Sequence, residues 1–166
     1  IMDASFLSSE GKVALITGGS RGIGRSTALA FADAGADVVI AARKLPDLEA
    51  VAAEIKQMGR KALVVETHAK KSEDLKNLVD ETMAEFGRID ILVNNAATNP
   101  AMSSVLDTDE EVFSHIIDTN LKGYFMLSKL VGKIMVEQKS GNIINISSSG
   151  GVSPVEGVGP YCISKA

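Results

Sequence analysis

The chain has 166 residues and a formal net charge of -4, with 45% hydrophobic and 23% charged residues. This composition is typical of one globular domain with a sizeable core, and it excludes intrinsic disorder as the main state. The acidic balance argues against a nucleic acid bound through its phosphates. No apolar run approaches the ~20 residues of a membrane helix. We therefore expect neither a nucleic acid nor a membrane as a partner.

The cysteine content and the first residues bear on the cellular compartment. One cysteine, Cys162, excludes an internal disulfide and is compatible with a reducing environment. Residues 1–10 lack the basic-then-apolar order of a signal peptide. We therefore expect a cytoplasmic protein.

Short apolar runs rich in Val and Ile alternate along the chain with longer stretches of helical apolar spacing. Five such runs predict strands buried on both faces, at residues 12–17, 37–42, 61–66, 89–93 and 142–146. The stretches between them predict helices. Repeated β-α units imply an α/β fold with a doubly wound parallel sheet and helices on both faces. Ligands bind such sheets beyond the carboxyl ends of the strands, so we expect functional residues directly after strands.

Capping residues predict where the helices begin and end. Ser72, followed by two acids, is a predicted N-cap. Thr108, with Glu111 three residues later, is predicted to begin a long helix that runs to about Gln138. Glycines before the predicted strands are expected to supply left-handed helix C-termini, at Gly35, Gly59, Gly87 and Gly141.

A glycine-rich loop follows the first predicted strand and precedes a helix that runs to about Ala34. Its sequence is Thr17-Gly18-Gly19-Ser20-Arg21-Gly22-Ile23-Gly24. A phosphate is bound by backbone N–H groups and by the positive end of a helix, and glycine allows close approach. The loop therefore predicts a phosphate site.

Two other motifs match this loop in part. A P-loop requires a lysine where Arg25 stands. Gly18 to Gly22 also has the letters of a nucleophile elbow, for which His68 and His115 are the only candidate bases. No earlier strand exists to supply the oxyanion loop of such a hydrolase, so both alternatives are disfavoured.

The loop resembles the Thr-Gly-x-x-x-Gly-x-Gly loop of the short-chain dehydrogenase/reductase family. Asn94-Asn95-Ala96-Ala97 resembles the family's Asn-Asn-Ala-Gly segment, with Ala97 in place of the last glycine. Asn120 matches the catalytic asparagine, and Ser148 stands thirteen residues before Tyr161, as in the family. Tyr161 and Lys165 complete Tyr-x-x-x-Lys, share a helix face, and follow Pro160, which suits the start of a helix. The chain is thus identified as a classical member, similar to 3-oxoacyl-ACP reductases and carbonyl reductases.

The resemblance implies a fold, a reaction and roles for the matching residues. Residues 1–166 would form a single Rossmann-like catalytic domain of three αβα layers, C-terminally truncated, without the family's last strands and substrate loop. The implied reaction is hydride transfer between NADP(H) and a ketone, aldehyde, 3-oxoacyl thioester or corresponding alcohol. Tyr161 would be the general acid/base, Lys165 would lower its pKa and hold the nicotinamide ribose, Ser148 would orient the carbonyl, and Asn120 would position a water. The alternative is a non-catalytic NADP-binding module or fragment.

Cofactor choice is predicted from the end of the second strand, Ala41-Ala42-Arg43. NAD enzymes typically carry an acid there for the ribose 2′-OH, and this chain has none. Arg43 and Arg21 suit a 2′-phosphate, so NADP is favoured and NAD remains an alternative. After the third strand, His68-Ala69 takes the place of the family's Asp-Val pair near the adenine. No metal is expected, and the implied cofactor-binding residues are Gly18, Ser20, Arg21, Gly22, Ile23, Gly24, Arg43, His68, Ala69, Asn95, Ala96, Ala97, Tyr161 and Lys165.

Apolar side chains surround much of the predicted long helix. One face must cover the sheet, so the surplus predicts a helix–helix interface. The resemblance implies a homodimer or homotetramer. The side chains concerned are Ile116, Ile117, Leu121, Phe125, Met126, Leu130 and Ile134.

Overall fold

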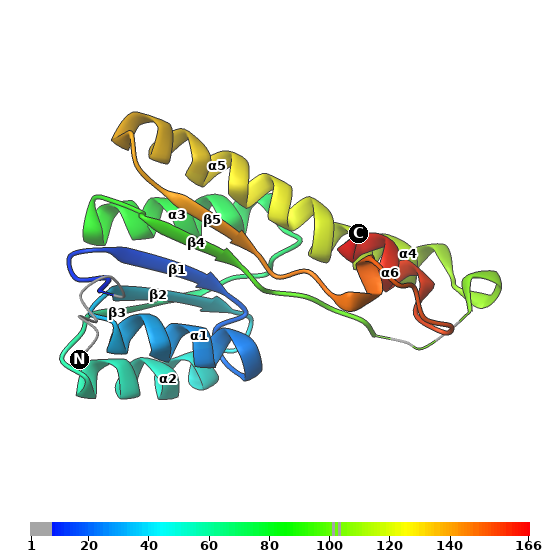
Figure 1. Ribbon diagram of the computed structural model, residues 1–166, viewed down its shortest axis with the longest axis horizontal. Helices are drawn as coiled ribbons and strands as arrows, with labels where there is room; N and C mark the ends of the chain where they lie inside the picture. The colour runs from blue at the N-terminus through cyan, green and yellow to red at the C-terminus, as the bar shows by residue number, and fades with distance from the viewer. Residues whose placement is uncertain (1–7, 101, 103) are drawn as a thin grey trace, which may run out of the picture.

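The computed structural model describes residues 8–100, 102 and 104–166. Residues 1–7, on which part of the expected absence of a signal peptide rests, lie outside this part. Five parallel strands form one sheet in the order β3-β2-β1-β4-β5 (Figure 1). The strands are β1 (Val13–Thr17), β2 (Asp37–Ala42), β3 (Ala62–Glu66), β4 (Ile91–Asn94) and β5 (Asn142–Asn145).

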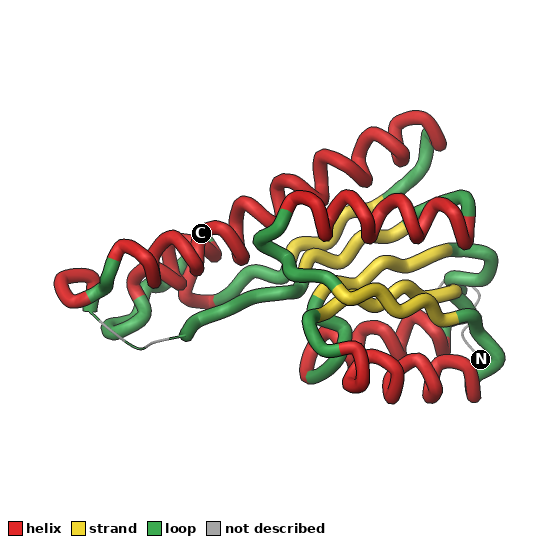
Figure 2. Tube along the Cα trace, turned by 180° about the vertical axis from the view of Figure 1, so that it is seen from behind, coloured by secondary structure: helices red, strands yellow, loops and turns green. Residues whose placement is uncertain are grey.

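Helices cover both faces of the sheet, which confirms the predicted three-layer fold (Figure 2). Helices α1 (Gly22–Asp33) and α2 (Leu45–Gln57) lie on one face, and α3 (Ser72–Phe86) and α5 (Gly123–Gln138) on the other. Helices α4 (Glu110–Ile117) and α6 (Gly159–Lys165) lie beyond the carboxyl ends of the strands (Figure 1). Within the described ranges, no helix combines the length and apolar character needed to cross a bilayer.

Two apolar cores result from the alternation of side chains along the strands. In β1, Val13 and Leu15 join the core under α3 and α5, whereas Ala14 and Ile16 join the core under α1 and α2. All four are buried, and full burial of a Leu or Ile side chain contributes about 1.5 to 3 kcal/mol. The central strands therefore have the two buried faces that their continuous apolar runs predict.

Strand β5 departs from that prediction because all four of its residues are exposed. Ile143 retains 36% and Ile144 39% of its accessible surface. The strand lies at the edge of the sheet, pairs only with β4 among the described strands, and packs against α5. An apolar run thus correctly predicts the strand here but not its burial.

Three predicted helix ends are wrong. Ser72 is the first helical residue rather than the cap. The Thr108 hydroxyl donates to the Ser104 carbonyl oxygen at 2.7 Å, so it caps the preceding turn, and Asp109 is the residue before α4. Lys139, with φ 55, provides the left-handed end of α5 in place of Gly141. The predicted left-handed glycines Gly35, Gly59 and Gly87 are confirmed.

The predicted long helix is divided into three parts. A π-helical segment, η3 (Asp118–Lys122), joins α4 to α5, and a 3-10 turn, η2 (Val105–Asp107), precedes α4. Single-turn π segments often occur at functional sites, and this one contains Asn120. Another 3-10 turn, η4 (Ser149–Gly151), follows β5.

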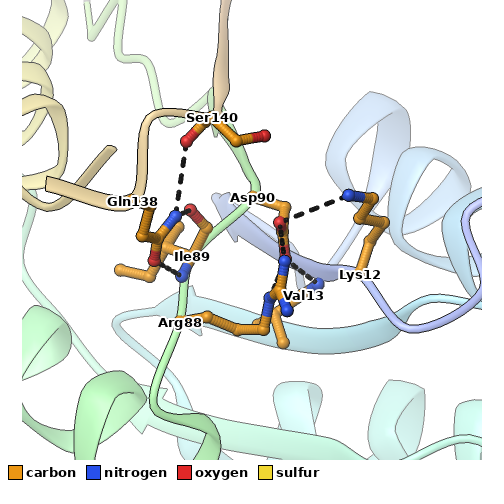
Figure 3. A network of polar contacts seen from close by, with 7 residues as sticks. All are labelled: Lys12, Val13, Arg88, Ile89, Asp90, Gln138 and Ser140. Atoms are coloured by element: carbon orange, nitrogen blue, oxygen red, sulfur yellow. Dashed lines mark hydrogen bonds and ion pairs between the residues drawn. The ribbon is translucent and has the colours of Figure 1, made fainter. Parts of the chain in front are cut away.

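Asp90 organises a polar network at the amino ends of β1 and β4 (Figure 3). Its carboxylate accepts hydrogen bonds from the Val13 amide at 2.9 Å and from Arg88 Nε and Nη2 at 2.7 and 2.6 Å. Lys12 Nζ lies 3.7 Å from it. Burial alone would raise the pKa of Asp90, but the Arg88 hydrogen bond, the Val13 amide and the charges of Arg88 and Lys12 together lower it. The network holds two central strands in register at the edge opposite the glycine loop.

A second contact beside this network fixes the end of α5 (Figure 3). Gln138 Oε1 accepts from the Ile89 amide at 3.1 Å, and Gln138 Nε2 donates to the Ile89 carbonyl oxygen at 2.9 Å. Helix α5, which continues from the segment η3 with Asn120, is therefore anchored at its far end.

Candidate active site

The glycine loop between β1 and α1 lies at the carboxyl edge of the sheet and leaves the first turn of α1 without a side-chain cap among the described residues. Arg21, the residue before α1, is extended and its side chain makes no capping hydrogen bond. The first amides of the helix are thus available to an anion. Gly22 has φ +54, and a Cβ built on it would meet nothing within 4 Å. This open cradle at a helix N-terminus fits a phosphate group.

Asn95 and Thr17 lock this loop to the end of β4. Asn95 Nδ2 donates to the carbonyl oxygens of Thr17 at 2.8 Å and Gly18 at 3.2 Å. The Thr17 hydroxyl accepts from the amides of Asn95 at 3.0 Å and Ala96 at 3.1 Å. A Cβ on Gly24 would lie 2.2 Å from the Gly18 oxygen and 2.5 Å from Asn95 Nδ2. Gly24 therefore has to be glycine for the loop to close.

A cleft of about 420 Å³ opens beside the loop, a size within the range of small-molecule sites. Its walls contain twelve of the fourteen predicted cofactor-binding residues and omit Tyr161 and Lys165. Among the described residues, no group of three His, Cys, Asp or Glu side chains is arranged to hold a metal ion. The sequence prediction did not include the lining residues Thr17, Ala41, Ala42, Lys44, Asp47, Thr67, Thr98, His115 and Thr119.

Four charged side chains line the cleft, and three of them follow β2 in the sequence. Arg21, Arg43 and Lys44 line the cleft and are exposed. Asp47, in the first turn of α2, lines it as well. An acid, Asp47, thus lies four residues after Arg43. The sequence prediction considered only the end of β2 and did not include it.

His68 follows β3 and contributes a buried polar atom without a partner. Its buried Nδ1 has no hydrogen-bond partner within the described part of the chain. Burial, followed by the charges of Lys70, Arg43 and Lys71, lowers the pKa of His68. A neutral imidazole has one nitrogen that accepts and one that donates. His68 is therefore suited to a polar ligand group in the cleft, such as an adenine edge.

The two alternative motifs for the glycine loop lack support in the structure. Arg25 Nη2 donates to Glu54 Oε2 of α2 at 2.6 Å and does not line the cleft. Within the described part of the chain, no hydrogen bond joins Ser20 to His68 or His115. His115 Nδ1 instead lies 3.5 Å from Lys70 Nζ.

Asn120, in η3, bridges the cleft and helix α6. Its Oδ1 accepts from the Thr98 amide at 2.8 Å, and its Nδ2 donates to the Thr98 carbonyl oxygen at 3.0 Å. Nδ2 also donates to Ser164 Oγ at 2.9 Å. Both donors of this buried amide are thus used by protein atoms. One lone pair of Oδ1 remains for the water that the family resemblance implies.

Of the remaining predicted catalytic residues, Ser148 lies in the loop after β5, and Tyr161 and Lys165 lie on α6. Ser148 Oγ accepts from the Gly150 amide at 3.2 Å. Lys165 is buried, and its Nζ donates to the Ile146 carbonyl oxygen at 2.6 Å and to the Tyr124 hydroxyl at 3.1 Å. Among the described residues, the Tyr161 hydroxyl makes no hydrogen bond, and none joins any two of Asn120, Ser148, Tyr161 and Lys165. The structure brings the four to one end of the sheet without linking them directly.

Comparison with known proteins identifies the family. The sequence model of the short chain dehydrogenase family matches residues 12–166. The chain belongs to the short-chain dehydrogenase family. The chain is 41% identical over 156 residues to a 3-oxoacyl-[acyl-carrier-protein] reductase of Synechocystis sp., covering 93% of this chain and 63% of that protein.

Two solved structures with similar folds carry different cofactors. A metagenomic short-chain oxidoreductase in complex with NADP is 35% identical, with a TM-score of 0.90, covering 94% of this chain and 71% of that one. An NAD⁺-bound xylitol dehydrogenase is 31% identical, with a TM-score of 0.91, covering 94% and 60%. The chain spans less than two thirds of the length of the Synechocystis relative.

Proposed function

We propose that this chain is the dinucleotide-binding catalytic domain of an oxidoreductase. It would transfer hydride between NADP(H) and a carbonyl or secondary alcohol, the carbonyl being a ketone, an aldehyde or a 3-oxoacyl thioester. The observation that carries the proposal is the Asn120 bridge. It joins Thr98, on the wall of the cleft, to Ser164, which stands between Tyr161 and Lys165 on α6. Cofactor cleft and proton donor are thereby coupled through one buried side chain.

The lining of the cleft suits the phosphate and adenine parts of a dinucleotide. The free amides of α1 and the Gly22 cradle would hold the pyrophosphate. His68, with its unpartnered Nδ1, would contact the adenine, and Asn95 to Ala97 would line the path toward the nicotinamide. When bound, the nicotinamide supplies or accepts the hydride.

The chain's own residues would handle the proton and the developing charge. Tyr161 would donate a proton to the carbonyl oxygen during reduction and take it back during oxidation. Ser148 would hydrogen-bond that oxygen and stabilise its negative charge. Lys165 would hold the nicotinamide ribose beside Tyr161. Asn120 would hold α6 in place, and its Oδ1 would accept a hydrogen bond from a water.

NADP is the proposed cofactor because cations outnumber acids at the end of β2. Arg43 and Lys44 follow β2 and line the cleft, against Asp47, and Arg21 of the glycine loop lines the same cleft. A guanidinium group can bind a phosphate through two parallel hydrogen bonds. The two solved relatives hold NADP and NAD⁺ respectively, so this preference rests on the arginines of this chain.

We further propose a cytoplasmic homodimer or homotetramer built on η3 and the start of α5. Leu121 and Phe125 are exposed by 50% and 63%. The predicted apolar surplus is smaller than expected, because Ile116 is buried and Met126, Leu130 and Ile134 pack against the core. Light scattering at micromolar concentration measures the oligomeric state. A monomeric parent protein, or an oligomer whose mass Phe125→Glu leaves unchanged, would contradict the proposal.

Turnover tests the enzymatic proposal. Because the chain spans less than two thirds of its Synechocystis relative, the assay uses two proteins: the 166-residue chain, and a chimaera of this chain with the part of that relative that the match does not cover. Carbonyl substrates are reduced with NADPH, and Tyr161→Phe should lower kcat by about 10²-fold or more while the cofactor still binds. Near-normal turnover by Tyr161→Phe would refute the role of Tyr161. Cofactor binding without turnover by either protein would favour the non-catalytic module.

A further inference from the structure

Tyr124 contacts the catalytic-motif lysine although no sequence motif includes it. It is the second residue of α5, directly after Gly123. Its hydroxyl oxygen lies 3.1 Å from Lys165 Nζ, and the ammonium nitrogen lies 4.8 Å from the centre of its ring. The same side chain therefore meets the lysine with a hydrogen-bond acceptor and with a π-face.

Lys165 needs such a partner because it is a buried cation without a paired carboxylate. Its residue surface is only 6% exposed, and no ion pair of Lys165 exists among the described residues. Burial lowers the pKa of Lys165, since it penalises the charged form. Two neutral oxygens, those of Ile146 and Tyr124, receive its hydrogen bonds. An ammonium has three donors, so one remains for a ligand.

The backbone fixes Tyr124 in this position. A Cβ on Gly123 would lie 2.5 Å from the Ala69 carbonyl oxygen, so the start of α5 packs directly against the loop after β3. One turn earlier, Asn120 holds Ser164, the neighbour of Lys165. Asn120 with Ser164 and Tyr124 with Lys165 thus form two consecutive contacts along the seam between η3–α5 and α6.

We propose that Tyr124 is a positioning residue that holds the Lys165 ammonium in its charged form and in one orientation, leaving its third donor for the nicotinamide ribose. This inference rests on the proposed function. Burial and the neighbouring charge of Tyr161 raise the pKa of Tyr124, so its hydroxyl stays protonated. Tyr124 therefore acts through Lys165 and exchanges no proton with the substrate.

The contact is measured by NMR on the 166-residue chain, with lysines labelled with ¹³C at Cε. Lys165→Met identifies the Lys165 signal, whose titration midpoint is then followed with pH. Tyr124→Phe keeps the ring and removes the acceptor, so it should lower the midpoint by about half a unit to one unit. Tyr124→Leu removes the ring as well and should lower it further. Phe125→Leu, a change at the exposed next residue, should leave it unchanged.

Steady-state kinetics of the chimaera measure how the contact between Tyr124 and Lys165 affects turnover. Tyr124→Phe should lower kcat about two- to tenfold, the value of one hydrogen bond, and leave the NADPH Kd within about twofold. In a Lys165→Met background the same change should have no further effect, because the residue through which it acts is gone.

Two results would overturn the proposal. One is a Lys165 midpoint in Tyr124→Phe equal to that of the parent chain. The other is an equal loss of kcat with and without Lys165. Absence of NADPH binding and turnover in the parent proteins would instead count against the proposed function, while the NMR midpoint still reports on the contact.

Discussion

The hydroxyl of Thr17 at the end of β1 accepts a hydrogen bond from the backbone amide of Asn95 at the end of β4, at 3.0 Å. Asn95 Nδ2 in turn donates a hydrogen bond to the Thr17 carbonyl oxygen at 2.8 Å. These reciprocal bonds join the two strands where the cleft opens. They make the shape of the glycine loop dependent on a residue that follows it by more than seventy positions.

Thr17→Val should therefore destabilise the fold and weaken cofactor binding together. It removes the acceptor of two amides, Asn95 and Ala96, and a buried unsatisfied amide costs about 1 to 3 kcal/mol. We expect a loss of about 2 to 4 kcal/mol in urea unfolding, with a higher NADPH Kd. Thr17→Ser keeps the hydroxyl and should lose only about 1 kcal/mol. Equal losses in the two variants would contradict this account.

Arg43→Ala should raise the Kd of NADPH by about tenfold or more and leave that of NADH within about twofold. The reason is that only NADPH carries the 2′-phosphate. Asp47→Asn should act in the opposite direction on NADPH, because it removes a negative charge from the same wall. Arg25→Ala is the matched control, since Arg25 pairs with Glu54 outside the cleft. An equal effect of Arg43→Ala on both cofactors would refute the assignment of NADP.

Asp90→Asn should lower the free energy of unfolding at neutral pH. It should also make that free energy fall less as the pH is lowered. The pKa of Asp90 is lowered in the fold, so the unfolded chain binds its proton first as the pH falls. Its contribution is present above the unfolded pKa of about 3.9 and is lost as the pH falls through the folded value. Urea unfolding between about pH 7 and about pH 3 should show a smaller acid loss in the variant. Asp80→Asn, in an exposed pair with Lys76, should change little, and parallel curves for Asp90→Asn and the parent chain would exclude this role.

The sequence predicts those features that depend on neighbouring residues. Apolar runs locate all five strands, and the glycine loop predicts an open helix N-terminus because its glycines act locally. Twelve predicted cofactor residues meet in one cleft because each follows a strand, and the carboxyl ends of parallel strands share an edge.

Features that depend on tertiary contacts could not be predicted from the sequence. Thr108 has the spacing of a cap but its hydroxyl binds Ser104 instead. The π segment around Asn120, the contact of Tyr124 with Lys165 and the place of His115 in the cleft all arise from α4 and α5 packing across other elements. No local pattern encodes these contacts, because the partners lie tens of residues apart.

Direct titration of the 166-residue chain with NADPH, followed by cofactor fluorescence, tests the central claim that the cleft binds a dinucleotide. Gly22→Asp places a carboxylate in the open cradle, in a left-handed conformation that Asp tolerates. Gly59→Asp is the matched control, because Gly59 has φ +78, equally open surroundings and no place in the cleft. We predict saturable binding by the parent chain and by Gly59→Asp, and loss of binding by a folded Gly22→Asp. No saturable binding by the folded parent chain, or undiminished binding by Gly22→Asp, would contradict the claim.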